Sequence, residues 1–210
     1  MTPTTLNRTR RVVGTALAAA TLAAALSACA PLIVGGAVVG GVMAVDRRTA
    51  GTQIEDEGIE LRAANRIRET LGDRAHVNVT SYNRQALLTG EVATAQDRQA
   101  VEQMVSQVEN VRSVVNDLAV MPPSTLSQRS TDTFITGKVR ASLVDAQDIS
   151  ANSFKVVTER NTVYLMGRVS QREANRATDI ARGVTDVRKV VRVFEIVSEE
   201  ELRRIAPQPA

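Results

Sequence analysis

The hydrophobic and polar positions of this chain follow a pattern that occurs twice. The matching segments are residues 77–80 and 154–157, 86–92 and 163–169, and 108–115 and 184–191. The first two pairs are offset by 77 residues and the third pair by 76. A nearly fixed internal period of this kind indicates one structural module present in two copies.

Each copy begins with a segment whose apolar residues recur at helical spacing. The residues expected to face the core are Leu61, Ala64, Ile67 and Leu71 in the first copy, and Ile135, Val139 and Leu143 in the second. In the second copy, Thr131 or Asp132 is expected to cap the start of this helix, because short polar side chains accept hydrogen bonds from the first free backbone N–H groups.

Two short strands with alternating polarity follow the helix, separated by polar turns at residues 81–85 and 159–162. Gly90 and Gly167 lie within the second strand of each copy, where a bulge or a close approach of a helix is expected. The remaining elements are a second helix over residues 96–107 or 171–182 and a β-branched strand over 113–120 or 189–197. The order αββαβ predicts an α+β fold with two layers in each module.

The amino-terminal segment has a different character. Residues 1–11 carry three arginines and no acid, and residues 12–26 are apolar and rich in alanine. This arrangement is typical of a secretory signal. Two other interpretations of this region remain open. In the first, Cys29 follows an ordinary apolar segment by chance. In the second, the uncharged residues 12–45 contain a membrane span. Pro31 and four glycines between residues 35 and 41 weigh against a regular span.

Leu26-Ser27-Ala28-Cys29 resembles the lipobox of bacterial lipoproteins. The resemblance implies that the Cys29 thiol receives a diacylglycerol, that cleavage precedes Cys29, and that the new amine is acylated, for example with palmitate. Lipoproteins that stay in the inner membrane favour Asp after the cysteine, whereas this chain has Ala30 at that position. The resemblance therefore implies a protein anchored in the outer membrane and facing the periplasm. Residues 1–28 are then a signal peptide, and residues 29–54 a lipidated, glycine-rich flexible tether.

Composition restricts the chemistry open to the rest of the chain. There is one cysteine and one histidine, His76, and only 2% of the residues are aromatic. These counts exclude a disulfide framework, a cysteine-based zinc cluster and a two-histidine metal site. His76 is expected in a loop or at a strand entry, and the carboxylate pairs Glu55 with Glu57 and Asp145 with Asp148 stand among polar residues. We therefore expect no enzyme activity, no cofactor and no metal.

The net charge of +3 depends on the signal segment, since 23 cations and 23 anions remain after residues 1–28 are removed. The two modules are nevertheless polarised. Residues 55–121 carry 7 cations and 11 anions, whereas residues 124–197 carry 12 cations and 8 anions. Only the second module is expected to be attracted to an anionic surface. Nucleic acid is not an expected partner, because the chain lacks an aromatic stacking platform and the signal indicates the cell envelope.

Three features resemble the BON-domain family: the strand that ends in Gly-x-Val, the helix after it, and the strand with Val-x-x-Val-Val. Residues 51–56 and 131–140 carry further likeness to dual-BON outer-membrane lipoproteins, a group associated with cell division and envelope stress. The resemblance implies two αββαβ modules, each with two helices on a three-stranded mixed sheet. The expected organisation is a first BON domain over 55–121, a linker over 122–130, a second BON domain over 131–197, and a charged tail over 198–210.

The first helix of the second module presents an unusual outward face. Phe134 is expected about 140° from the core stripe, in the first helical turn, beside Lys138 and small residues. Free backbone N–H groups at that position would favour a phosphate. The resemblance implies that this helix binds anionic phospholipid. The residues expected to do so are Phe134, Gly137, Lys138, Arg140, Ala141 and Val144. The alternative for Phe134 is packing on the linker or on the other module.

Two functions follow as hypotheses. The first is a non-catalytic lipoprotein that binds anionic phospholipids such as phosphatidylglycerol and cardiolipin and supports envelope integrity, including at division sites. The second is a protein-interaction adaptor, in which the acidic first module or a strand edge binds an outer-membrane assembly complex such as the barrel-assembly machinery. The first helix of the first module, with Arg62, Arg66 and Glu69 outward, is expected to be an ordinary solvated face.

Overall fold

The structure is a computed structural model, and it describes residues 46–205. The expected signal peptide, Cys29 and most of the tether lie outside the described residues. Within the described residues, both modules belong to one compact unit. Among residues 46–205, no helix combines the length and the apolar character that a membrane span needs.

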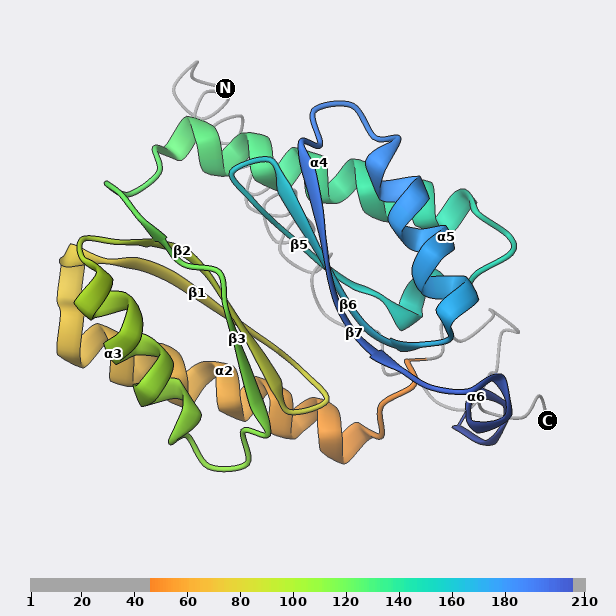
Figure 1. Cartoon of the computed structure of the whole chain (residues 1–210), viewed down its shortest axis with the longest axis horizontal. Helices are drawn as coiled ribbons and strands as arrows, with labels where there is room; N and C mark the ends of the chain where they lie inside the picture. Colours follow the sequence, from red (N-terminus) through yellow and green to blue (C-terminus); the bar gives the residue numbers. More distant parts are fainter. Residues whose placement is uncertain (1–45, 206–210) are drawn as a thin grey trace, which may run out of the picture. The chain divides into compact units, whose positions relative to one another are not determined.

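The first module contains two helices on one face of a mixed sheet (Figure 1). Its elements are α2 (Ala50–Leu71), the short 3-10 helix η2 (Gly72–Arg74), β1 (His76–Tyr82), β2 (Gln85–Val92), α3 (Ala95–Ser106), β3 (Ser113–Asn116) and β4 (Ala119–Val120). The central strand β2 pairs antiparallel with β1 and parallel with both β3 and β4. The single final strand expected over 113–120 is thus two short strands, interrupted at Asp117 and Leu118.

The second module repeats this arrangement, with α4 and α5 on one face of its sheet (Figure 1). Its elements are α4 (Leu126–Asp145), η3 (Ala151–Ser153), β5 (Lys155–Glu159), β6 (Thr162–Val169), α5 (Gln171–Arg182) and β7 (Lys189–Ile196). The strand β6 pairs antiparallel with β5 and parallel with β7. The predicted αββαβ order and mixed three-stranded sheet are confirmed. An unexpected short helix, α6 (Glu199–Ile205), follows in the segment expected to be a charged tail, and its Leu202 is buried.

The core of each module lies between its helices and its sheet. In the second module the predicted stripe Ile135, Val139 and Leu143 is buried. In the first module the predicted stripe was only partly right. Ile67 and Leu71 are buried, but Ile59 and Ala63 join them, whereas Leu61 is 64% exposed. The buried positions follow a spacing of four residues from Ile59, and Leu61 lies about 200° from Ile59 around the helix.

The start of α4 differs from the sequence prediction. Thr125 is the N-cap, and its side chain accepts from the backbone N–H of Gln128 while the Gln128 side chain accepts from the N–H of Thr125. This reciprocal pair is a capping box. The predicted caps Thr131 and Asp132 lie inside the helix, and Phe134 lies about two turns beyond the helix start. Phe134 therefore has no free N–H groups beside it, and the argument for a phosphate there is wrong.

Asp132 has a different role, which Asp56 repeats in the first module. The Asp132 carboxylate is buried and accepts from the backbone N–H groups of Arg160 and Asn161, each at 2.8 Å. Both turn residues have positive φ, as a two-residue hairpin turn of type I′ requires. Asp56 accepts in the same way from the turn residues Asn83 and Arg84. In each module a helix carboxylate thus fixes the first helix against the hairpin.

Close packing explains the two strand glycines. Gly90 has φ 109°, and a Cβ at this position would lie 2.0 Å from the carbonyl oxygen of His76. A Cβ at Gly167 would lie 2.4 Å from the carbonyl oxygen of Ser153. A close approach does occur at both positions, but the neighbour is the backbone at the start of β1 and in η3, and not one of the predicted helices.

The modules meet through the sheet faces that carry no helices. Tyr82 and Leu87 of the first module form one buried cluster with Tyr164, Met166 and Val193 of the second. Because of this contact, β2 and β6 are buried on both faces along nearly their whole length. The predicted alternation of polar and apolar residues therefore fails in these two central strands.

Two arginines attach the segment before α2 to both modules. Arg47 donates to both carboxylate oxygens of Glu173 at 2.7 and 2.8 Å, and to the carbonyl of Arg168. Arg48 pairs with Asp56 at 2.8 Å and lies over the ring of Tyr82 at 4.3 Å. The end of the segment expected to be a flexible tether is therefore held by both modules, and its last five residues belong to α2.

Candidate functional site

The outward surface of α4 carries a continuous stripe of apolar and small side chains. At about 100° per residue, these side chains fall within an arc of about 80°, on the side of the helix opposite the buried stripe. The residues are Leu126, Ser130, Phe134, Gly137, Ala141 and Val144, and all are exposed. We call them the outer stripe of α4. Three large apolar side chains on one exposed helix face are energetically unfavourable on a surface that contacts only water.

Cationic side chains border this stripe on both sides. Lys138 lies on one side, with its Nζ 4.9 Å from the centroid of the Phe134 ring, a favourable cation–π distance. Its ammonium group also pairs with Asp186 at 2.9 Å. Arg140 lies on the other side and donates to the carbonyl of Val156 at 3.4 Å. The stripe is thus apolar along its centre and basic along its edges.

The residues expected to bind lipid fall on or beside this surface. Phe134 is 66% exposed, so it packs neither on the linker nor on the other module. Gly137, Ala141 and Val144 are exposed on the stripe, Arg140 is exposed, and Lys138 is half-buried. A Cβ at Gly137 would contact nothing within 4 Å, so this glycine leaves the surface beside Phe134 open.

Sequence reasoning missed Leu126, because it assigned residues 122–130 to a linker. The capping box of Thr125 and Gln128 was visible in the sequence and would have placed Leu126 at the first helical position. With Leu126 included, the outer stripe extends from the first residue of α4 to Val144, near its end.

A cavity of about 350 Å³ opens beside the carboxyl-terminal end of the stripe. Arg140 and Val144 contribute to its lining, together with Arg48, Phe154 and Lys155. Lys155 is paired with Glu60 at 2.7 Å, and Arg48 with Asp46 and Asp56. The cavity thus combines an apolar wall with charged groups of both signs, since Asp46 also lines it.

The equivalent helix of the first module has a different surface. Arg62 pairs with Glu55 at 2.6 Å, and Arg66 donates to the carbonyl of Met104. These contacts agree with a solvated face, but two exposed apolar residues, Ile54 and Leu61, interrupt it. They lie seven residues apart and so on one side of α2. This module carries the net negative charge, which disfavours an anionic surface.

Comparison with known proteins gives a family match for both modules. The BON-domain family model matches residues 56–122 and 131–198. An outer membrane lipoprotein, DolP of Haemophilus influenzae, is 35% identical over 172 residues, which cover 81% of this chain and 89% of that protein. A 21 kDa hemolysin of Actinobacillus pleuropneumoniae is 32% identical over 155 residues, covering 73% of this chain and 80% of its own.

Proposed function

Because this chain belongs to the BON-domain family, with two BON domains, and is similar to outer membrane lipoprotein DolP, we propose that it is a non-catalytic lipoprotein that binds anionic phospholipid through the outer stripe of α4. Lys138 and Arg140 bind headgroup phosphates, and Phe134, with its apolar neighbours, enters the boundary between headgroups and acyl chains. Phosphatidylglycerol and cardiolipin are the proposed lipids.

The proposed location is the outer membrane, with the folded modules facing the periplasm. Three features support it, namely the basic and apolar segment of residues 1–26, the lipobox ending at Cys29, and the similarity to an outer membrane lipoprotein. Each acyl methylene buried in lipid contributes about 0.8 kcal/mol, so more than one acyl chain on Cys29 gives stable attachment. The anchor then keeps α4 near a membrane surface, and a role in envelope integrity and at division sites follows as part of the proposal.

The observation that carries the proposal is the exposure of Phe134 between cations. An interfacial helix binds lipid through an apolar face with basic residues along its border. The outer stripe of α4 has this composition, and it belongs to the module with 12 cations against 8 anions. Each basic residue near an anionic bilayer contributes about 1 kcal/mol, and salt weakens this contribution.

Vesicle co-sedimentation of residues 44–210 tests the proposal without the anchor. We expect binding to phosphatidylglycerol vesicles, weaker binding as salt increases, and none to phosphatidylcholine vesicles. Phe134→Glu removes apolar burial and adds a repulsive charge, together roughly 2–3 kcal/mol, or about 30- to 150-fold in affinity. Leu61→Glu is the matched control, because Leu61 is 64% exposed on the equivalent helix. Equal binding by wild type and Phe134→Glu would contradict the proposal.

A second function, as a protein-interaction adaptor, is favoured by one observation. Ile54 and Leu61 are exposed apolar residues on the acidic first module, a surface suited to a basic and apolar protein partner. A component of an outer-membrane assembly complex is the proposed partner class. Under this function Leu61→Glu abolishes co-purification of that partner, whereas Phe134→Glu leaves it unchanged.

A further inference from the structure

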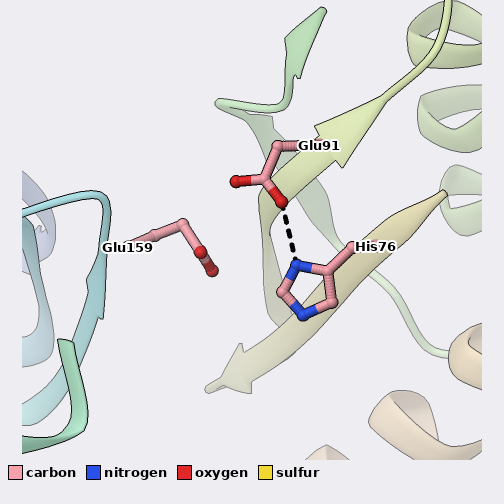
Figure 2. A group of neighbouring side chains, drawn as sticks. All are labelled: His76, Glu91 and Glu159. Atoms are coloured by element: carbon pink, nitrogen blue, oxygen red, sulfur yellow. Dashed lines mark hydrogen bonds and ion pairs between the residues drawn. The ribbon is translucent and has the colours of Figure 1, made fainter. Parts of the chain in front are cut away.

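Three ionisable side chains from the two modules meet at one point. His76 is the first residue of β1, Glu91 lies near the end of β2, and Glu159 is the last residue of β5. Figure 2 shows both carboxylates turned toward the imidazole ring of His76. One potential ligand atom from each residue lies within 4.8 Å of the other two. We call these residues the interface triad.

The two carboxylates of the triad are deeply buried. Glu91 is 0% exposed and Glu159 is 3% exposed. Glu91 accepts from Arg160 Nη1 at 2.9 Å, from the backbone N–H of Ser124 at 3.1 Å, and shares a hydrogen bond with His76 Nδ1 at 3.0 Å. Arg160 contacts Oε1 of Glu91, so the oxygen facing His76 is Oε2. The position of Glu91 is therefore fixed from several sides.

Glu159 is less well compensated. Its carboxylate accepts from the side-chain amide of Asn78 at 2.9 Å, and within residues 46–205 no cationic side chain forms an ion pair with it. Burial raises the pKa of Glu159. The hydrogen bond from Asn78 lowers this pKa, and the negative charge of Glu91 raises it further. Two buried carboxylates thus lie close together, and Arg160 pairs with Glu91 and not with Glu159.

We propose that the interface triad is a binding site for a divalent transition-metal ion of the zinc class, with Glu91, Glu159 and a ring nitrogen of His76 as ligands. One imidazole and two carboxylates form a donor set that zinc accepts, with water in the fourth position. Ligand atoms held about 2.0 Å from a tetrahedral ion lie about 3.3 Å apart. His76 and Glu91 have nearly this separation already, and rotation of the Glu159 side chain supplies the third ligand.

The site would join the two modules. His76 and Glu91 belong to the first module and Glu159 to the second, so the ion binds only when the modules are packed as the structure has them. An ion that binds the folded protein and not the unfolded chain raises its stability. Magnesium and calcium prefer sets of oxygen ligands, so the imidazole disfavours them.

Thermal unfolding of untagged, chelator-treated residues 44–210, together with calorimetric titration of zinc chloride, tests the proposal. We expect one zinc ion per chain, and at a zinc concentration about 100 times the dissociation constant the melting temperature rises by roughly 5–10 °C. Magnesium chloride at the same concentration leaves the melting temperature unchanged. No zinc binding by the wild-type protein, or an equal shift with magnesium, would overturn the proposal.

Substitutions separate binding from folding. Glu159→Gln retains an oxygen for the Asn78 amide and removes the repulsion with Glu91, so its metal-free melting temperature equals or exceeds that of wild type while its zinc shift is lost. His76→Gln also loses the zinc shift. Glu60→Gln is the control, because Glu60 is another carboxylate that joins the modules, pairing with Lys155 at 2.7 Å outside the triad. It retains the zinc shift. Zinc shifts that persist in both triad variants would overturn the assignment.

Discussion

The orientation of α4 on its sheet depends on the Asp132 carboxylate, and Asp132→Ala tests this dependence. In the structure Asp132 is buried and receives both backbone N–H groups of the turn between β5 and β6, at 2.8 Å each. The alanine variant leaves these two donors without their acceptor. Arg160 and Asn161 would then have to keep positive φ values of 51° and 58° with less support.

The expected loss follows from these contacts. A hydrogen bond to a charged acceptor contributes about 1.5–3 kcal/mol, and the two bonds to Asp132 share one carboxylate, so we take the lower value for each. The free energy of unfolding then falls by about 3 kcal/mol. For a folded part of this size, about 1 kcal/mol corresponds to 2–4 °C, so the melting temperature falls by roughly 6–12 °C.

Chemical denaturation of residues 44–210, followed by circular dichroism, measures the change. Asp132→Asn keeps one neutral acceptor and is expected to lose about half as much stability. Asp145→Ala is the control, since Asp145 is exposed at the last position of the same helix, and it should change the free energy of unfolding by less than about 0.5 kcal/mol. An Asp132→Ala variant within about 1 kcal/mol of wild type would refute the reasoning.

Three other predictions concern stability. Burial alone would raise the pKa of Glu173, but hydrogen bonds, chiefly from the Arg47 guanidinium, lower it from its ordinary value of 4.5. The ionised Glu173 therefore stabilises the folded protein above the ordinary carboxyl pKa. This stabilisation is lost as the pH falls through the lowered pKa. Denaturation at a series of pH values should show this loss in wild type and not in Arg47→Ala. Gly90→Ala should destabilise the protein by more than about 2 kcal/mol, because its Cβ would meet the carbonyl of His76. Gly137→Ala, in open space on α4, should raise the melting temperature through a gain of about 0.5–1 kcal/mol.

Much of the fold was predictable because each module is encoded locally. The spacing of Ile135, Val139 and Leu143 marked the buried side of α4. The helix predicted over residues 171–182 coincides with α5 (Gln171–Arg182). The polar turns predicted at residues 81–85 and 159–162 contain the observed turn residues 83–84 and 160–161. These features depend on contacts between residues close in sequence, which a periodic pattern reports directly.

The contact between modules was not predicted, although a signal for it was present. Residues 86–88 and 163–166 are apolar without interruption, whereas a sheet with one solvated face would alternate. Within the interface triad, His76 and Glu91 are opposite one another in the β1–β2 hairpin, but Glu159 had no local signal, because it lies 83 residues from His76 and 68 from Glu91 in the sequence. Only the packing of one module on the other brings Glu159 to this pair.

The candidate lipid-binding surface was predicted in part. The exposure of Phe134 followed from its angle to the core stripe, and the structure places it at 66% exposure. Its supposed position in the first helical turn was wrong, because the capping box at Thr125 starts α4 earlier. That error concealed Leu126, so the sequence described only the later part of the outer stripe.

The central claim is that the outer stripe of α4 enters an anionic membrane, and a tryptophan at position 134 tests it most directly. The chain contains no tryptophan, so Phe134→Trp places a single indole on the stripe. With phosphatidylglycerol vesicles we predict a blue shift of its emission and quenching by brominated acyl chains, both reversed at high salt. Leu61→Trp on α2 should show neither effect. An emission spectrum of Phe134→Trp that does not change on addition of phosphatidylglycerol vesicles would contradict the account.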